Sequence, residues 1–152
     1  MKKVLLITII LFSIISVNAQ TENTKYNKLL ADSLGADEYG MKSYMFVILK
    51  TGAKQVKDKD SLNILFKGHM NNINRLVDIK KLVVAGPFEK NENSYRGLFI
   101  LNVNTKEEAL DLLRTDPAIA AGIFDTEIFK WYGSAALSEY LKYCDLITQK
   151  KY

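Results

Sequence analysis

Two side chains in this sequence have the types that acid–base chemistry requires, His69 and Asp116. His69 is the only histidine, and an imidazole can take or give a proton near neutral pH. A carboxylate that accepts a hydrogen bond from the ring fixes its tautomer and stabilises the imidazolium. If the fold brings the two side chains together, they form a general acid–base pair. The alternative is a buried, hydrogen-bonded histidine, with Asp116 serving as a turn or helix-end residue.

The segment around Asp116 places this carboxylate at a turn. Residues 116–122 read Asp-Pro-Ala-Ile-Ala-Ala-Gly. Pro117 lacks an N–H group and disfavours α geometry in the residue before it, so we expect Asp116 just past a helix end with its side chain free for a partner. The small residues up to Gly122 allow a close approach, which suits the floor of a pocket or a tight packing corner.

His69 belongs to a segment with helical periodicity. Between Leu62 and Lys80 the apolar residues with helical spacing are Leu62, Leu65, Phe66, Ile73, Leu76 and Val77. His69 takes the vacant seventh position after Leu62 on the same face. Its imidazole is therefore expected to point toward a sheet, or a groove beside it. Asp60 or Ser61 can cap the start of this helix.

The elements that must position the pair follow the order strand, helix, strand, strand, helix, strand. Thr105 and Glu108 form a capping-box pattern at the start of the second helix. This order is typical of a ferredoxin-like α+β sandwich, which is the predicted fold class. The expected strands are residues 43–50, 82–88, 97–103 and 123–132, and the expected helices are residues 62–80 and 106–114.

The first nineteen residues have the pattern of a secretory signal. Lys2 and Lys3 precede an apolar run, and Val17 and Ala19 suit cleavage before Gln20. We expect an exported chain, periplasmic or secreted, without a stable membrane anchor after cleavage. A retained anchor is the alternative, although the apolar run is shorter than the roughly 20 residues that a spanning helix needs.

Composition limits the function classes. The chain has 152 residues, 48% of them hydrophobic, which fits one globular domain. Without Lys2 and Lys3 the formal charge falls from +4 to +2, so nothing favours a nucleic-acid partner. The single cysteine, Cys144, cannot form an internal disulfide and is expected to be a small core residue.

Two extensions flank the predicted domain at residues 42–133. Residues 20–41 are polar and mixed and are expected to be a linker with one short helix. Residues 134–152 are expected to form a C-terminal helical extension. Its apolar stripe, which must pack on another surface, consists of Leu137, Tyr140, Leu141, Cys144 and Ile147.

Other residues are candidates for ligand contact rather than chemistry. Gly86 and Pro87 can bring backbone close to a ligand, or can simply end a strand in a turn. Tyr44 belongs to a set of aromatic residues that suits an aromatic-binding cavity, and equally a sheet core or a dimer interface. The other members are Phe46, Phe88, Phe99, Phe129 and Trp131.

Metal and serine chemistry have little support. One histidine and one cysteine cannot supply a usual zinc ligand set, and the acidic residues lack ligand spacing. No Gly-x-Ser-x-Gly motif occurs, and the histidine has no obvious serine partner. We therefore expect neither a metal nor another cofactor.

Several short motifs follow one another along the chain: His69 in the first helix, Val84-Ala85-Gly86-Pro87 at the end of the second strand, Gly97 opening the third, and Asp116, Pro117, Ala120 and Gly122 before the fourth. Their order resembles the YCII-related (YciI-like) family over roughly residues 42–132. The resemblance implies a dimeric α+β barrel in which two ferredoxin-like sheets face each other. It also implies a proposed active site of one histidine and one aspartate, here His69 and Asp116. One branch of the family includes an enzyme that removes chloride from hydroxylated aromatic rings. The export signal and the two extensions depart from the short cytoplasmic members.

Three functional hypotheses follow. In the first, His69 is the general acid or base and Asp116 orients it, in a lyase or hydrolase type of reaction on a small cyclic or aromatic molecule. In the second, the same pair is structural in a non-catalytic ligand-binding or dimerisation module. In the third, the C-terminal helix docks the protein in an envelope assembly. A homodimer and a small-molecule ligand are the expected partners.

Overall fold

The sheet that carries the site has four antiparallel strands in the order β2-β3-β1-β4. The computed structural model describes residues 23–150, so the predicted signal at residues 1–19 lies outside the described part. The strands are β1 (Met41–Thr51), β2 (Leu82–Pro87), β3 (Tyr95–Leu101) and β4 (Phe124–Ser134). This order and direction confirm the ferredoxin-like α+β fold.

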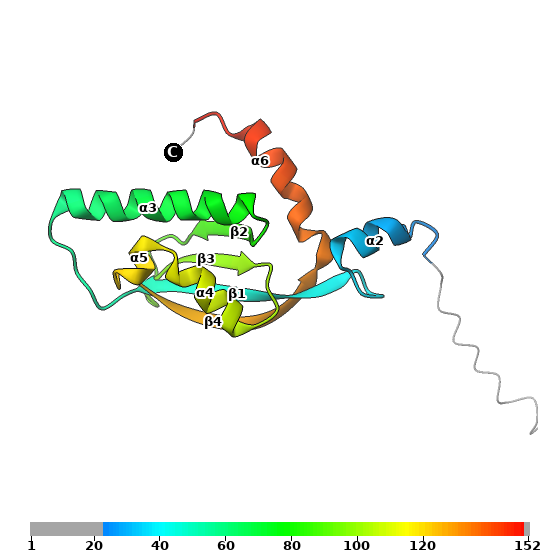
Figure 1. Cartoon of the computed structure of the whole chain (residues 1–152), viewed down its shortest axis with the longest axis horizontal. Coiled ribbons are helices and arrows are strands. Elements are labelled where there is room, and N and C mark those ends of the chain that lie inside the picture. The colour runs from blue at the N-terminus through cyan, green and yellow to red at the C-terminus, as the bar shows by residue number, and fades with distance from the viewer. Residues whose placement is uncertain (1–22, 151–152) are drawn as a thin grey trace, which may run out of the picture.

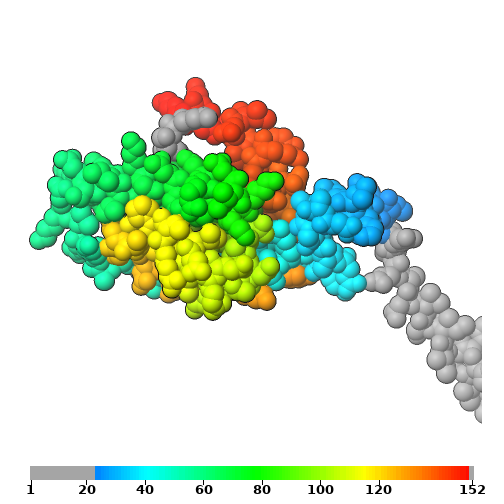
Figure 2. Space-filling view, in the orientation of Figure 1, coloured from blue at the N-terminus to red at the C-terminus, as the bar shows by residue number. Residues whose placement is uncertain are grey.

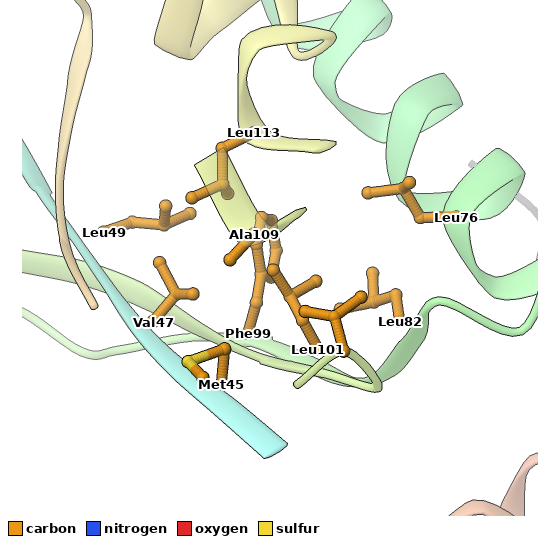
Figure 3. Packing of buried hydrophobic residues seen from close by; sticks show 10 residues of the cluster. Met45, Val47, Leu49, Leu76, Leu82, Phe99, Leu101, Ala109 and Leu113 are labelled. Atoms are coloured by element: carbon orange, nitrogen blue, oxygen red, sulfur yellow. The ribbon is translucent and has the colours of Figure 1, made fainter. Parts of the chain in front are cut away.

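Three helices lie over one face of this sheet (Figure 1). They are α3 (Lys59–Asp78), α4 (Lys106–Arg114) and the single turn α5 (Pro117–Ala120). The core between helices and sheet is aliphatic, apart from Phe99 and Met45 (Figure 3). Its other buried members are Val47, Leu49, Leu76, Leu82, Leu101, Val103, Ala109 and Leu113. Helix spacing and strand alternation put these apolar side chains on facing surfaces.

Side-chain caps set the starts of the helices. Thr105 and Glu108 form the predicted capping box of α4. For α3 the prediction was wrong by two residues, because Asp58 is the N-cap and accepts a hydrogen bond from the backbone N–H of Ser61. Asp60 lies instead in the first turn, where a negative charge favours the positive end of the helix dipole.

The turn predicted after α4 contains a further helical turn, α5. Asp116 is its N-cap, and Pro117 takes the first helical position, where its missing N–H costs nothing. Gly122 follows with a φ of 74°, and its carbonyl oxygen accepts a hydrogen bond from the N–H of Lys54 at 3.1 Å. A Cβ on Gly52 would overlap that same carbonyl oxygen, so this end of the segment is a tight packing corner.

The second face of the sheet carries aromatic side chains along β1 and β4, and we call it the aromatic face. Tyr44 is fully buried there, and its hydroxyl donates to the carbonyl of Ser134 at 2.8 Å. Its ring lies 5.7 Å from that of Trp131, which is 37% exposed, and Phe129 beside it in β4 is 50% exposed. This face is therefore only partly covered in the described chain.

The segments outside the domain are short helices. Residues 20–41 include α2 (Lys28–Leu34), as expected for the linker. The C-terminal extension begins with a 3-10 turn, η1 (Ala135–Tyr140), and continues as α6 (Leu141–Ile147), so it is not one regular helix. In Figure 1 α2 and α6 extend from the body of the domain. No helix within residues 23–150 is long and apolar enough to cross a membrane.

Only the first part of the predicted C-terminal stripe packs on the domain. Leu137 contacts the aromatic face, and the Tyr140 hydroxyl donates to the carbonyl of Val83 in the edge strand β2. Ile147 is 81% exposed, and Cys144 is half-buried outside the core clusters. The expectation that Cys144 is a core residue was wrong, because α6 leaves the domain surface before its stripe can be covered.

Candidate active site

His69 lies on the inner face of α3 with its ring held between aromatic neighbours. The residue is 8% exposed. Its ring stacks on Phe99 of the sheet, with centroids 5.9 Å apart and an interplanar angle of 22°, and it lies 5.2 Å from the ring of Phe124. The prediction from periodicity, an imidazole directed toward the sheet, is confirmed. Packing on two sides leaves the ring little freedom to rotate.

The predicted contact between His69 and Asp116 is present. Nδ1 of His69 lies 2.7 Å from Oδ2 of Asp116, across 47 residues of sequence. Asp116 is completely buried. Since a carboxylate only accepts hydrogen bonds, Nδ1 carries the proton and donates a hydrogen bond to Asp116. The neutral ring then has Nε2 as its unprotonated nitrogen.

Backbone groups hold the other carboxylate oxygen of Asp116. Oδ1 accepts the backbone N–H of Ala118 at 2.9 Å and that of Ile119 at 3.3 Å. The same side chain therefore caps α5 and orients His69. Both predicted interpretations of Asp116, helix-end residue and histidine partner, describe one geometry.

Close packing of α5 on α3 brings Asp116 within hydrogen-bond distance of His69. Gly68 immediately precedes His69, and a Cβ placed on it would lie 2.8 Å from Cγ of Pro117. Figure 2 shows α5 against α3 at the molecular surface. Any larger residue at position 68 would push the two helices apart.

A polar network continues from Asp116 along α3, and it was not predicted from the sequence. Nδ2 of Asn72 lies 3.5 Å from Oδ2 of Asp116, and Oδ1 of Asn72 accepts from Nη2 of Arg75 at 2.8 Å. Arg75 also donates to the hydroxyl of Thr115, which precedes Asp116. Asn72 is one turn after His69, so its helical spacing was the signal that could have found it.

A cavity of about 840 Å³ opens beside His69, between α3 and the sheet. Its walls are largely apolar and include three phenylalanines, Phe66, Phe99 and Phe124. Within residues 23–150 Nε2 of His69 has no hydrogen-bond partner, and no fully enclosed side-chain nitrogen or oxygen lacks one. Nε2 is therefore the ring atom that remains accessible, in a residue that lines the cavity.

The structure brings together some of the predicted ligand contacts and separates others. Gly86 and Pro87 line the cavity of His69. Tyr44 lies on the opposite face of the sheet, since strand alternation turns it away from the neighbouring Met45. Gly122 lines a different hollow of about 500 Å³, next to Gly52. Tyr44 and Gly122 thus do not join the cavity of the acid–base pair.

Metal ligands are not clustered in the described chain. Within residues 23–150 no group of three or more histidine, cysteine, aspartate or glutamate side chains is placed to hold an ion. The chemistry that this arrangement can perform is proton transfer at Nε2, with Asp116 stabilising the imidazolium through Nδ1.

Comparison with known families agrees with the fold. The profile of the YCII-related domain matches residues 43–132, which is more than half of the chain. The chain therefore belongs to the YCII-related domain family.

Among solved structures, the chain is similar to 5-chloro-2-hydroxyhydroquinone dehydrochlorinase from Burkholderia phenoliruptrix AC1100, in complex with 2,5-dihydroxybenzoquinone. The identity is 19% and the TM-score 0.41, over 57% of this chain and 92% of that one. No curated protein matches the chain.

Proposed function

We propose that this protein uses His69 as a general acid or base on a small cyclic or aromatic molecule. The observation that carries the proposal is the 2.7 Å contact between Nδ1 of His69 and Oδ2 of Asp116, on the wall of an apolar cavity. A buried carboxylate that serves only to cap α5 would need no partner on α3. In Asp116 the second carboxylate oxygen, Oδ2, accepts a hydrogen bond from the imidazole.

In this mechanism Nε2 of His69 takes a proton from a bound molecule or from a water beside it. The positive charge that forms on the ring is stabilised by Asp116, whose Oδ1 is already held by two backbone N–H groups. The proton is then returned from Nε2 to the leaving atom. This sequence serves a lyase-type elimination as well as a hydrolysis.

The walls of the cavity favour a flat ring over a polar chain. Phe66 and Phe124 meet edge to face, with centroids 5.8 Å apart, and Phe99 stacks on His69. Aromatic rings offer such a ligand both faces and edges to pack on. Gly86 and Gly97 lie beside Phe99 on the sheet and have no side chains, so a ring can approach the backbone there.

The test compares the wild type with His69→Gln, which retains a side chain of similar size but cannot take a proton. Deuterium incorporation into cyclohexanone and 1-indanone, followed by NMR in D₂O, reports proton abstraction, and release of phenol from phenyl acetate reports hydrolysis. We expect turnover by the wild type and a loss of about 100-fold or more in His69→Gln. Equal rates in two folded proteins would overturn the proposal.

One observation favours a second function, a ligand-binding module without catalysis. Asp116 caps α5 and shares a network with Asn72 and Arg75, which is what a structural role would need. In that case His69→Gln would bind the same ligands with little change in affinity, and neither protein would turn them over.

We also propose that the protein is exported and acts as a homodimer. The partly exposed aromatic face of the sheet supports the dimer, because Phe129 and Trp131 would be covered if two such faces met. The signal pattern at residues 1–19 supports export. Mass spectrometry of the protein purified from the cell envelope or medium would test the export proposal. We expect its N-terminus at Gln20.

A further inference from the structure

Arg96 has the most distinctive position among the residues that line the cavity but take no part in the proposed proton transfer. Among residues 23–150, it is the only ionisable residue in the lining apart from His69. It is solvent-exposed, whereas Phe99 on the same wall is 2% exposed. The guanidinium therefore marks the open side of the cavity, and the aromatic rings form its closed side.

A β-bulge brings Arg96 to this side of the sheet. The register between β1 and β3 pairs Leu49 with Gly97 but Lys50 with Tyr95, so Arg96 is the extra residue. In a regular strand neighbouring side chains point to opposite faces. Here Arg96 and Gly97 both line the cavity, because the bulge turns the Arg96 side chain toward the helices.

The backbone and side chain of Arg96 are both fixed. Its carbonyl accepts the N–H of Phe88 at 2.9 Å. Its Nε donates to the hydroxyl of Thr51 at 2.6 Å, and Thr51 also lines the cavity. This contact uses one edge of the guanidinium and sets the plane of the group.

The remaining donors of Arg96 are available. Within residues 23–150 its Nη1 and Nη2 atoms have no hydrogen-bond partner, and no carboxylate forms an ion pair with it. A planar pair of N–H groups matches the two oxygens of a carboxylate. These two donors therefore remain free on the solvent-exposed side of the cavity.

We infer that the cavity selects molecules with an apolar ring and a carboxylate, and that Arg96 binds the carboxylate at the cavity mouth. This inference rests on the proposed function in that it names the substrate class of the same site. Arg96 is a specificity-determining residue, and Thr51 is the positioning residue that orients it. The ring of the ligand packs among the phenylalanines beside His69.

The test uses a matched pair of probes, indole-3-acetate and its neutral amide, indole-3-acetamide. Their affinities for the full-length mature protein are measured by NMR titration at constant ionic strength. We expect the wild type to bind the acid about tenfold more tightly than the amide, since hydrogen bonds to a charged group are the stronger ones. Arg96→Gln should bind the two probes equally, and Arg96→Lys should retain only part of the preference. Thr51→Val should also weaken binding of the acid while leaving the amide unchanged.

Arg114→Gln is the matched control, because Arg114 is an exposed arginine on α4 that pairs with Asp111 outside the cavity. It should behave as the wild type does. Three results would overturn the inference: no binding of the acid, equal binding of acid and amide by the wild type, or a preference that survives in Arg96→Gln. These are equilibrium measurements with His69 intact. Their failure therefore differs from failure of the acid–base proposal, which shows as unchanged turnover in His69→Gln.

Discussion

Pro117 packs against Gly68, the residue that immediately precedes His69 in α3. The pyrrolidine ring occupies the space that a side chain at position 68 would need, since a Cβ there would be 2.8 Å from Cγ of Pro117. This contact holds α5 close enough to α3 for Asp116 to reach the imidazole. The glycine thus determines the geometry of a pair to which it does not belong.

Gly68→Ala should therefore weaken the site although alanine is the better helix former. Overpacking costs about 1–3 kcal/mol, and the higher helix propensity returns about 1 kcal/mol. We expect a net loss of about 1 kcal/mol in the free energy of unfolding, measured with urea, and a longer Nδ1 to Oδ2 distance in a crystal structure. Lys67→Ala, at the exposed neighbouring position, is the control. A Gly68→Ala protein more stable than the wild type, with the contact intact, would contradict this account.

In Asp116→Asn the neutral ring of His69 should no longer be held in a single tautomer. An asparagine oxygen can still cap α5, but its amide group no longer provides the charged acceptor that Nδ1 uses. We expect ¹⁵N NMR of the ring to show one neutral tautomer, with the proton on Nδ1, in the wild type, and a mixture of tautomers in the variant. Because His69 is the only histidine, the signals need no assignment. The same mixture in both proteins would mean that Asp116 does not orient the ring.

Asn72→Ala should destabilise the protein more than its size suggests. Asn72 is 6% exposed, and its loss removes the side-chain hydrogen bonds that join α3 to Thr115 and Asp116. Each such hydrogen bond contributes about 0.5–1.5 kcal/mol, so we expect a loss of about 1–3 kcal/mol in the free energy of unfolding. Urea titration would measure it, with Asn71→Ala on the exposed side of α3 as the matched control. Equal stabilities of the two variants would show that the network contributes nothing.

A hydrogen bond between Tyr132 and Asp37 ties the linker to β4 and should show in the pH dependence of both groups. It raises the pKa of Tyr132 to about 12 and lowers the pKa of Asp37 below its usual value of 3.8. The stabilisation from this hydrogen bond is therefore complete between pH 3.8 and 10.0, the usual pKa values of the two groups. It falls as pH drops through the Asp37 pKa, and again as pH rises from 10.0, the usual value for tyrosine, through about 12.

The difference in phenolate absorbance between proteins with and without Tyr132→Phe isolates this one tyrosine among eight. We expect the midpoint of the Tyr132 titration to move down toward 10.0 when the same difference is measured in the Asp37→Asn background, because the charged acceptor is lost. A midpoint that Asp37→Asn leaves in place would contradict the assignment.

Phe129→Asp should separate the proposed homodimer without unfolding the protomer. Phe129 is 50% exposed on the aromatic face of the sheet, so the charge costs little in the monomer and much in an apolar interface. Sedimentation velocity should show the wild type as a dimer and this variant as a monomer. Ile64→Asp places the same charge at a residue of α3 that is 71% exposed and should leave the dimer intact. A monomeric wild type would overturn the dimer proposal.

The sequence determined the elements and several of their details, because these depend on neighbours along the chain. Helical spacing placed His69 on the inner face of α3, and Thr105 with Glu108 marked the start of α4. Strand and helix order gave the ferredoxin-like fold. Even the contact of His69 with Asp116 was expected, from residue types and from the resemblance to the family.

The tertiary structure decided which of the candidates share a cavity. Gly86 joined His69, while Tyr44 lies on the other face of the sheet and Gly122 in a separate corner. Arg96 was not recognised, because strand alternation assigns it to the wrong face and only pairing with β1 creates the bulge that turns it. Local periodicity records which side of its own element a residue occupies. The register of the strands and close contacts such as that of Gly68 with Pro117 decide which distant side chains meet there. Both arise only when the chain packs into its tertiary structure.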